Sequence, residues 1–228
     1  NKMGLPQGSF LFALQACYSL SMQEATLTCP QCHCEVTHTL HPFLDLAKHP
    51  KQKLAILTDS LFSVTCPSCT KQFTVLHELL VVDETQQVAL LLAPRSQVRE
   101  LDGAVTGRQD LQAYTLRLVT TSAALKEKIL LLDSNLDDRT IELCKLYLAM
   151  YMQKPEVQLF FAEHQTQANK LLFSVLDSEG ALEGSIECEY ELYNQLLETT
   201  QQFPLQKGFF TAEDQTWAYE RIKNSADR

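Results

Sequence analysis

Long apolar runs, glycine and proline are all scarce in this chain. No stretch approaches the roughly 18 uninterrupted apolar residues that a transmembrane helix requires. Only 7 of the 228 residues are glycine and 8 are proline, which excludes collagen-like and low-complexity sequences. With 45% hydrophobic and 21% charged residues, the composition is that of a globular protein, built as one large domain or two small ones.

Positive charge is also in short supply. The chain has 19 Lys and Arg against 28 Asp and Glu, and residues 115–228 carry 11 of the former and 18 of the latter. An acidic surface repels nucleic-acid phosphates and anionic lipids. The short basic patch "KHPKQK" is balanced by acidic residues within 29–69, so it is not the basic stripe typical of nucleic-acid binding. We therefore expect neither a nucleic-acid nor a membrane partner.

Sequence motifs of catalysis are missing as well. There is no phosphate-binding glycine loop and no G-x-S-x-G elbow. His77-Glu78 does not begin an H-E-x-x-H motif, because Val81 occupies the position of the second histidine. The acidic pair Asp137-Asp138 is interpreted as a helix start rather than an acid–base pair. The sequence therefore nominates no catalytic residue.

Cysteine is the residue whose distribution stands out. Five of the eight cysteines fall within residues 29–69, and Thr-Cys-Pro-x-Cys occurs twice, as "TCPQC" and "TCPSC". Two C-x-x-C turns can each supply half of a tetrahedral zinc shell, and proline fixes the backbone of such a turn. Four protein thiolates saturate zinc, which indicates a structural ion. The predicted ligands are Cys29, Cys32, Cys66 and Cys69.

Other readings of these residues stay open. Each Cys-Pro-x-Cys turn can instead be a redox dithiol, although such motifs usually stand alone between a strand and a helix. Cys34 offers a third sulfur on the first loop, beside His33; we expect Cys34 to point away from the site. The remaining histidines are expected on the surface or hydrogen-bonded in the core, and the remaining cysteines as small buried hydrophobes: His38, His41, His49, His77; Cys17, Cys144, Cys188.

Hydrophobic patterning predicts an α+β protein. We expect an N-terminal extension (1–24), a zinc-ribbon-like β domain with an inserted short helix (25–95), a polar linker (96–113) and an acidic α+β domain with a small antiparallel sheet (114–228). The extension is expected to be a packed element or a leader before a start at Met22, with a signal peptide as the alternative. Clustered cysteines suit a reducing cytoplasm.

Local signals place the elements. Strands are predicted over 25–28, 35–40 and 61–65, a helix over 51–57, and a hairpin whose arms are 72–82 and 87–92. In the second domain a strand is predicted over 114–120 and a helix from Ser122. Asp137 and Thr211 are predicted to cap two further helices, and the remaining elements are three strands and one helix: 157–164, 170–177, 185–190, 191–202.

The paired motifs also resemble a known family. The two Cys-Pro-x-Cys turns, the segment "SLFSVTCPSC" and the hairpin end "LLLAP" resemble the CpXC family, a presumed domain of bacteria and archaea without an established activity. Residues 116–148 resemble the segment that follows this domain in longer members. The resemblance implies that Cys29, Cys32, Cys66 and Cys69 are the motif cysteines; His33-Cys34 departs from the small or polar residue usual there.

These observations predict a structural zinc-binding protein of the cytoplasm, a non-enzymatic module that contacts an unidentified protein partner. Two alternatives come from other classes of function. One is an enzyme with its active-site cleft between the two halves, and the other is a nucleic-acid binder that uses the ribbon.

Overall fold

The computed structural model describes residues 22–94, 113–177 and 180–226. The predicted extension, with its leader and Cys17, and the predicted linker lie almost entirely outside these residues. The chain forms two compact units, each described here by itself. The first unit ends at Ser122 and also includes Gln206–Thr211; the second comprises Ala123–Leu205 and the chain from Ala212 onward.

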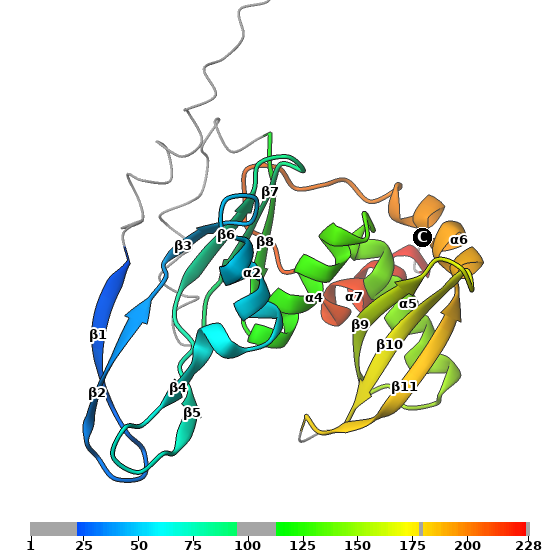
Figure 1. Cartoon of the computed structure of the whole chain (residues 1–228). Helices are drawn as coiled ribbons and strands as arrows, with labels where there is room; N and C mark the ends of the chain where they lie inside the picture. Colours follow the sequence, from blue (N-terminus) through cyan, green and yellow to red (C-terminus); the bar gives the residue numbers. More distant parts are fainter. Residues whose placement is uncertain (1–21, 95–112, 178–179, 227–228) are drawn as a thin grey trace, which may run out of the picture. The chain divides into compact units, whose positions relative to one another are not determined.

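Two short antiparallel hairpins form one end of the first unit (Figure 1). Their tips lie side by side, and each tip carries one Cys-Pro-x-Cys turn. Register is set next to the turns, where Thr28 pairs with Glu35 and Thr65 with Gln72. The strands of the hairpins are β1 (Gln23–Thr28) with β2 (Glu35–Leu40) and β4 (Ser63–Thr65) with β5 (Gln72–Thr74).

A short helix is inserted between the hairpins, as predicted. Helix α2 (Pro50–Leu57) has proline in its first turn, where the missing N–H costs no helical hydrogen bond. It buries Ile56 completely and leads into the 3-10 turn η1 (Ser60–Phe62), whose Phe62 is also fully buried. These apolar side chains anchor the segment that carries the second cysteine pair.

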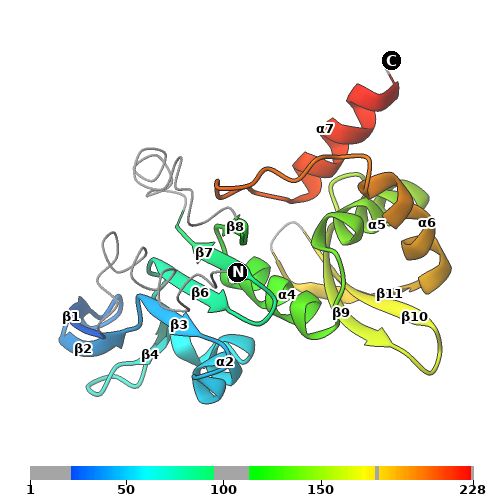
Figure 2. The same cartoon turned by 90° about the horizontal axis from the view of Figure 1, so that it is seen from above.

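A mixed four-stranded sheet completes the first unit (Figure 2). Its order is β3-β6-β7-β8, with β6 and β7 antiparallel and the two outer strands parallel to their neighbours. The strands are β3 (Phe43–Asp45), β6 (Leu79–Asp83), β7 (Val88–Leu92) and β8 (Thr115–Val119). One face is held by a core of Leu80, Val82, Ala89, Leu91, Ala93 and Leu116.

Two sequence-based expectations are corrected by this sheet. The strand at 114–120 was expected in the second domain, but β8 pairs with β7, and its buried Leu116 joins the core of the first unit. The expected arm 72–82 is two strands: β5 pairs with β4 and β6 with β7, so the chain changes sheets between Thr74 and Leu79.

The second unit packs helices on a three-stranded antiparallel meander of order β11-β10-β9. In β10 the alternate side chains Leu171, Phe173 and Val175 are buried, and the Phe173 ring meets Phe161 edge-on at 6.0 Å. Helices α4, α5 and α6 supply most of the rest of this core. The elements are α4 (Ser122–Asp133), α5 (Asp138–Tyr151), β9 (Gln158–Gln165), β10 (Lys170–Leu176), β11 (Leu182–Glu189), α6 (Tyr190–Thr200) and α7 (Gln215–Ala226).

Helix capping was predicted correctly at one helix and wrongly at another. Asp137 caps α5, because its carboxylate accepts the N–H groups of Arg139 (2.9 Å) and Thr140 (3.0 Å). At α7 the carboxylate of Asp214, not Thr211, accepts the N–H of Trp217 (3.0 Å). Thr211 instead bridges to β8. Within the described ranges, no helix is both long enough and apolar enough to cross a membrane.

Candidate metal centre

The two cysteine turns have the same backbone geometry. In the first, the N–H of Cys29 donates to the carbonyl of Cys34 (2.9 Å) and the N–H of His33 to the carbonyl of Cys29 (3.0 Å). In the second, Cys66 and Thr70 donate in the same pattern to Lys71 and Cys66, both at 2.9 Å. The fifth residue of each turn is left-handed, with φ of 58° at His33 and 59° at Thr70. The repeated sequence therefore folds into a repeated loop.

The four predicted sulfurs lie together. The Sγ atoms of Cys29, Cys32, Cys66 and Cys69 all lie within 4.8 Å of one another, and this is the only group of three or more metal-binding side chains found among the described residues. Sulfurs from opposite hairpins approach closely, at 3.6 Å for Cys29–Cys69 and 3.5 Å for Cys32–Cys66. Thiolates at about 2.3 Å from zinc in a tetrahedron are separated by roughly 3.8 Å, so the spacing fits one ion.

The first cysteine of each pair is buried and held toward its thiolate form. The N–H of Cys32 favours the Cys29 thiolate and, against the effect of burial, lowers the pKa of Cys29. Burial alone would raise the pKa of Cys66, but the Cys34 thiol and the N–H groups of Cys69 and Ser68 outweigh it and lower that pKa to about 6. Deprotonated sulfur is the form that binds metals.

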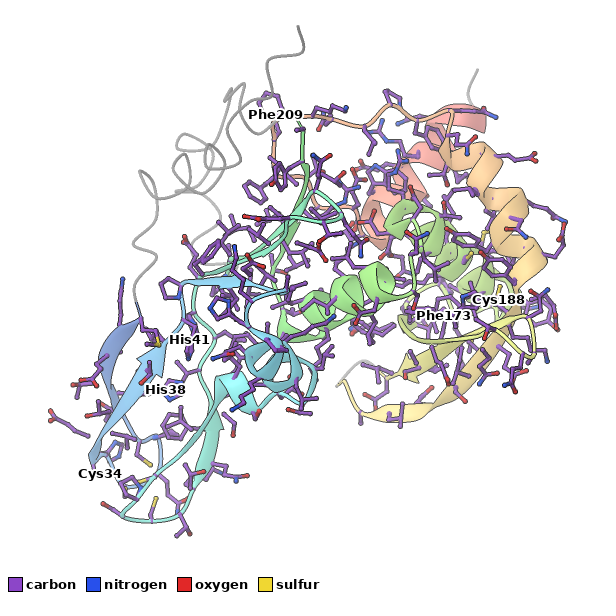
Figure 3. The ribbon with its side chains drawn as sticks, turned by 45° about the horizontal axis from the view of Figure 1, so that its top comes forward. Cys34, His38, His41, Phe173, Cys188 and Phe209 are labelled. Carbon is purple, nitrogen blue, oxygen red and sulfur yellow. The ribbon has the colours of Figure 1, made fainter. Side chains whose placement is uncertain are left out.

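Cys34 joins this cluster, contrary to the expectation that it points away (Figure 3). Its sulfur lies 3.1 Å from that of Cys66 and 3.4 Å from that of Cys32. The left-handed backbone at His33 turns the chain back, so Cys34 faces the second hairpin. The Ser68 hydroxyl favours the Cys34 thiolate, but the sulfurs of Cys66 and Cys32 outweigh it and raise the pKa of Cys34 to about 11.

Four histidines outside the cysteine turns, His38, His41, His49 and His77, do not belong to the sulfur cluster. Figure 3 shows His38 and His41 farther along the first hairpin from the tip that carries Cys34. His77 Nε2 lies 3.3 Å from the backbone N of His41, and burial lowers the pKa of both rings. His49 Nδ1 contacts the backbone of Asp45, 3.1 Å from its N. The backbone contacts of His77 and His49 agree with the sequence interpretation, whereas Nε2 of His38 and Nδ1 of His77 are buried without a hydrogen-bond partner among the described residues.

A buried charge network that the sequence reading missed lies in the second unit. Lys145 on α5 contacts Glu127 (2.7 Å) and Glu142 (2.8 Å), and Lys128 contacts Asp138 (2.8 Å). Glu127 also accepts the N–H of Phe161 on β9 (2.5 Å). The sequence signal that could have revealed this network is the presence of charged residues within the otherwise apolar helix segments 125–132 and 141–149. The network ties α4, α5 and β9 together, and the acidic cluster is structural.

The redox-dithiol alternative is not supported by this geometry. Each Cys-Pro-x-Cys turn sits at the tip of a β-hairpin rather than at the start of a helix, where a redox thiolate gains its stabilisation. The close sulfur contacts also run between hairpins. Cys144 and Cys188 are buried in the core of the second unit, as expected.

Comparison with known proteins agrees with the cysteine geometry. A sequence model described as CpXC protein matches residues 27–145, about half of the chain. The chain belongs to the CpXC family. The CpXC match begins near the end of β1, covers both cysteine turns, the mixed sheet and helix α4, and ends within α5, in agreement with the resemblance over residues 25–95 and 116–148. No curated protein and no solved structure matches the chain.

The donor set of this CpXC protein determines what the site can do. Four clustered cysteines can bind a metal ion, and tetrahedral sulfur sites suit soft or borderline cations such as zinc or iron. With four protein ligands in place, a tetrahedral ion has no open position for water or substrate. An ion bound there would therefore cross-link the two hairpins.

Proposed function

We propose that the protein binds one Zn²⁺ through Cys29, Cys32, Cys66 and Cys69, and that the ion is structural. The observation that carries this proposal is the convergence of two hairpin tips on one sulfur cluster. An isolated two-stranded hairpin is marginally stable in water, and each tip adds only one buried valine, Val36 or Val64. A shared ion supplies the stabilisation that these short hairpins lack.

We further propose that the clamped hairpins present a surface for a protein partner, with no reaction of their own. Among the described strands, β1 pairs only with β2, so its other edge carries a row of backbone N–H and C=O groups. Such an edge accepts an extended peptide as an additional strand. The acidic charge of the chain disfavours nucleic acid as the partner.

Metal analysis of the purified protein tests the first part. We expect one zinc per chain in the wild type and none in Cys66→Ser. Wild-type protein whose two hairpins fold without metal would contradict the proposal. One iron per chain would show that the thiolates hold iron instead of zinc.

The partner proposal is tested by comparing the wild type with one variant of strand β1. Cross-linking pull-downs with wild type and with Thr26→Pro, which removes one N–H from β1, should share zinc content but differ in captured protein. Thr26 is paired with Thr37 on the neighbouring strand, so zinc content and hairpin protection must be verified in the variant. Equal capture by both proteins would contradict recognition through this edge.

A further inference from the structure

The sulfur cluster has five members, one more than a tetrahedral ion uses. Three of them form a closed triangle, with edges of 3.1 Å for Cys34–Cys66, 3.4 Å for Cys32–Cys34 and 3.5 Å for Cys32–Cys66. The Cys32–Cys66 edge is shared with the four-sulfur set. Cys34 therefore lies against one edge of the shell that the proposed function assigns to zinc.

Because the two turns have nearly the same backbone, the role of Cys34 can be seen by comparing it with the equivalent residue of the second turn. Cys34 and Lys71 occupy the same position in their loops, since each accepts the closing N–H of the first cysteine of its turn. Only the first loop has a sulfur there. Cys34 is half-buried and fixed by this 2.9 Å hydrogen bond, whereas Cys32 is exposed. The second cysteine of the first pair thus has a neighbour able to replace it, and Cys69 has none.

We propose that Cys34 is an exchange ligand, which displaces Cys32 from the zinc shell. This inference rests on the proposed zinc site and adds a dynamic role to it. Zinc has no geometric preference from its d electrons, and it can pass through a five-coordinate transition state. A new bond forms between zinc and the Cys34 sulfur, the bond to Cys32 breaks, and the thiol proton passes from Cys34 to Cys32. Four zinc–thiolate bonds exist before and after, so no oxidant is needed.

Such exchange makes the ion kinetically labile although it is tightly held. A sulfur already at the shell lowers the barrier for releasing Cys32, and the thiolate of an outside acceptor can enter the shell at the exposed position that Cys32 leaves. A thiol-rich zinc acceptor is therefore the chemical class of partner that this site would exchange metal with.

Single and double substitutions test the ligand exchange. Cys32→Ser should keep one zinc, with affinity within about tenfold of the wild type, because Cys34 completes the shell. Cys69→Ser, the matched control without a reserve sulfur, should lose more than about 100-fold, as should Cys32→Ser/Cys34→Ser. Cys69→Ser/Lys71→Cys rebuilds the reserve in the second turn and should recover affinity.

Cobalt substitution gives a readout of the ligands themselves. The sulfur-to-cobalt charge-transfer absorption should show four thiolates in both the wild type and Cys32→Ser, and three in the double variant. Transfer of zinc to a chromophoric chelator should be slower in Cys34→Ser than in the wild type, by about tenfold or more.

The outcomes separate this inference from the proposed function. Wild-type protein without zinc contradicts the zinc site itself. Wild-type protein with one zinc, but with equal losses in Cys32→Ser and Cys69→Ser, or an unchanged transfer rate in Cys34→Ser, refutes the exchange role alone. Native hydrogen-exchange protection of β9, β10 and β11 in every variant shows that the second unit remains folded.

Discussion

Removing the metal, by chelation or by Cys66→Ser, should open the two hairpins and leave the rest of the chain folded. The amides of Cys29 and Cys66 close the turns by donating to Cys34 and Lys71, at 2.9 Å in both cases. These amides are direct reporters, because they are protected only while each loop is formed. The mixed sheet has a core of its own and does not depend on the ion.

The expected size of the effect comes from the small core between the hairpins. Val36 and Val64 are its only buried residues besides two cysteines, and two buried valines contribute together about 3–6 kcal/mol. Structural zinc sites in small peptides contribute apparent free energies of about 10–16 kcal/mol. The ion therefore contributes more to the stability of the hairpins than the two buried valines do. We expect the protection of the two reporter amides to fall by at least 100-fold, equivalent to about 2.8 kcal/mol.

Hydrogen exchange followed by mass spectrometry or NMR measures this loss. Segments 23–40 and 63–74 should lose protection, while β9, β10 and β11 keep theirs. Cys144→Ala, a buried cysteine of the second unit, serves as the control that should retain zinc and hairpin protection. Full hairpin protection in metal-free protein would refute the argument that the ion holds these strands.

Five further substitutions test the remaining physical claims. Lys145→Met leaves two buried carboxylates without a counter-ion and should lower the free energy of unfolding in urea by about 3–5 kcal/mol. Lys170→Met removes an exposed ion pair and should lower it by less than about 1 kcal/mol. Asp137→Ala removes the α5 cap and should cost about 1 kcal/mol. His33→Gly relieves a left-handed backbone and should stabilise the metal-loaded protein by about 1 kcal/mol. Burial raises the pKa of Asp45, but a lysine 2.6 Å away and backbone N–H groups outweigh it and hold that pKa below its ordinary value. The contribution of ionised Asp45 to the free energy of unfolding is therefore present above the pKa of the unfolded state and is lost as the pH falls through the pKa of the folded state. The urea midpoint of Asp45→Asn should lie below that of wild type at pH 7, and the difference should begin to shrink as the pH falls below about 4 and vanish only below the folded pKa of Asp45.

Features encoded within a few residues could be predicted from the sequence. The spacing of Cys29 and Cys32, and of Cys66 and Cys69, identified the cluster because a C-x-x-C turn is a local structure. The same holds for the proline at the start of α2 and for the Asp137 cap. The three strands of the second sheet follow from alternating apolar residues, which Leu171, Phe173 and Val175 show most clearly.

Features that depend on distant pairing could not be predicted this way. The sequence of β8 predicts a strand but not the unit to which it belongs, and only its pairing with β7 assigns it to the first unit. Thr211 and Asp214 both suit a helix cap, and the hydrogen bonds between Thr211 and β8 settle which one is used. Cys34 was misjudged because a left-handed residue such as His33 reverses the facing of the next side chain, and strand alternation does not anticipate that reversal.

The family match divides the molecule differently from its compact units. It ends at residue 145, inside α5, so the CpXC segment includes the second unit's helix α4 and the charged residues that join α4 to α5. A buried ion pair is rarely more stable than apolar residues of the same size, but it fixes which residues face each other. The sulfur cluster does the same for the two hairpins. The CpXC segment thus contains two arrangements that fix which residues face each other, the sulfur cluster in the first unit and the buried ion pairs in the second.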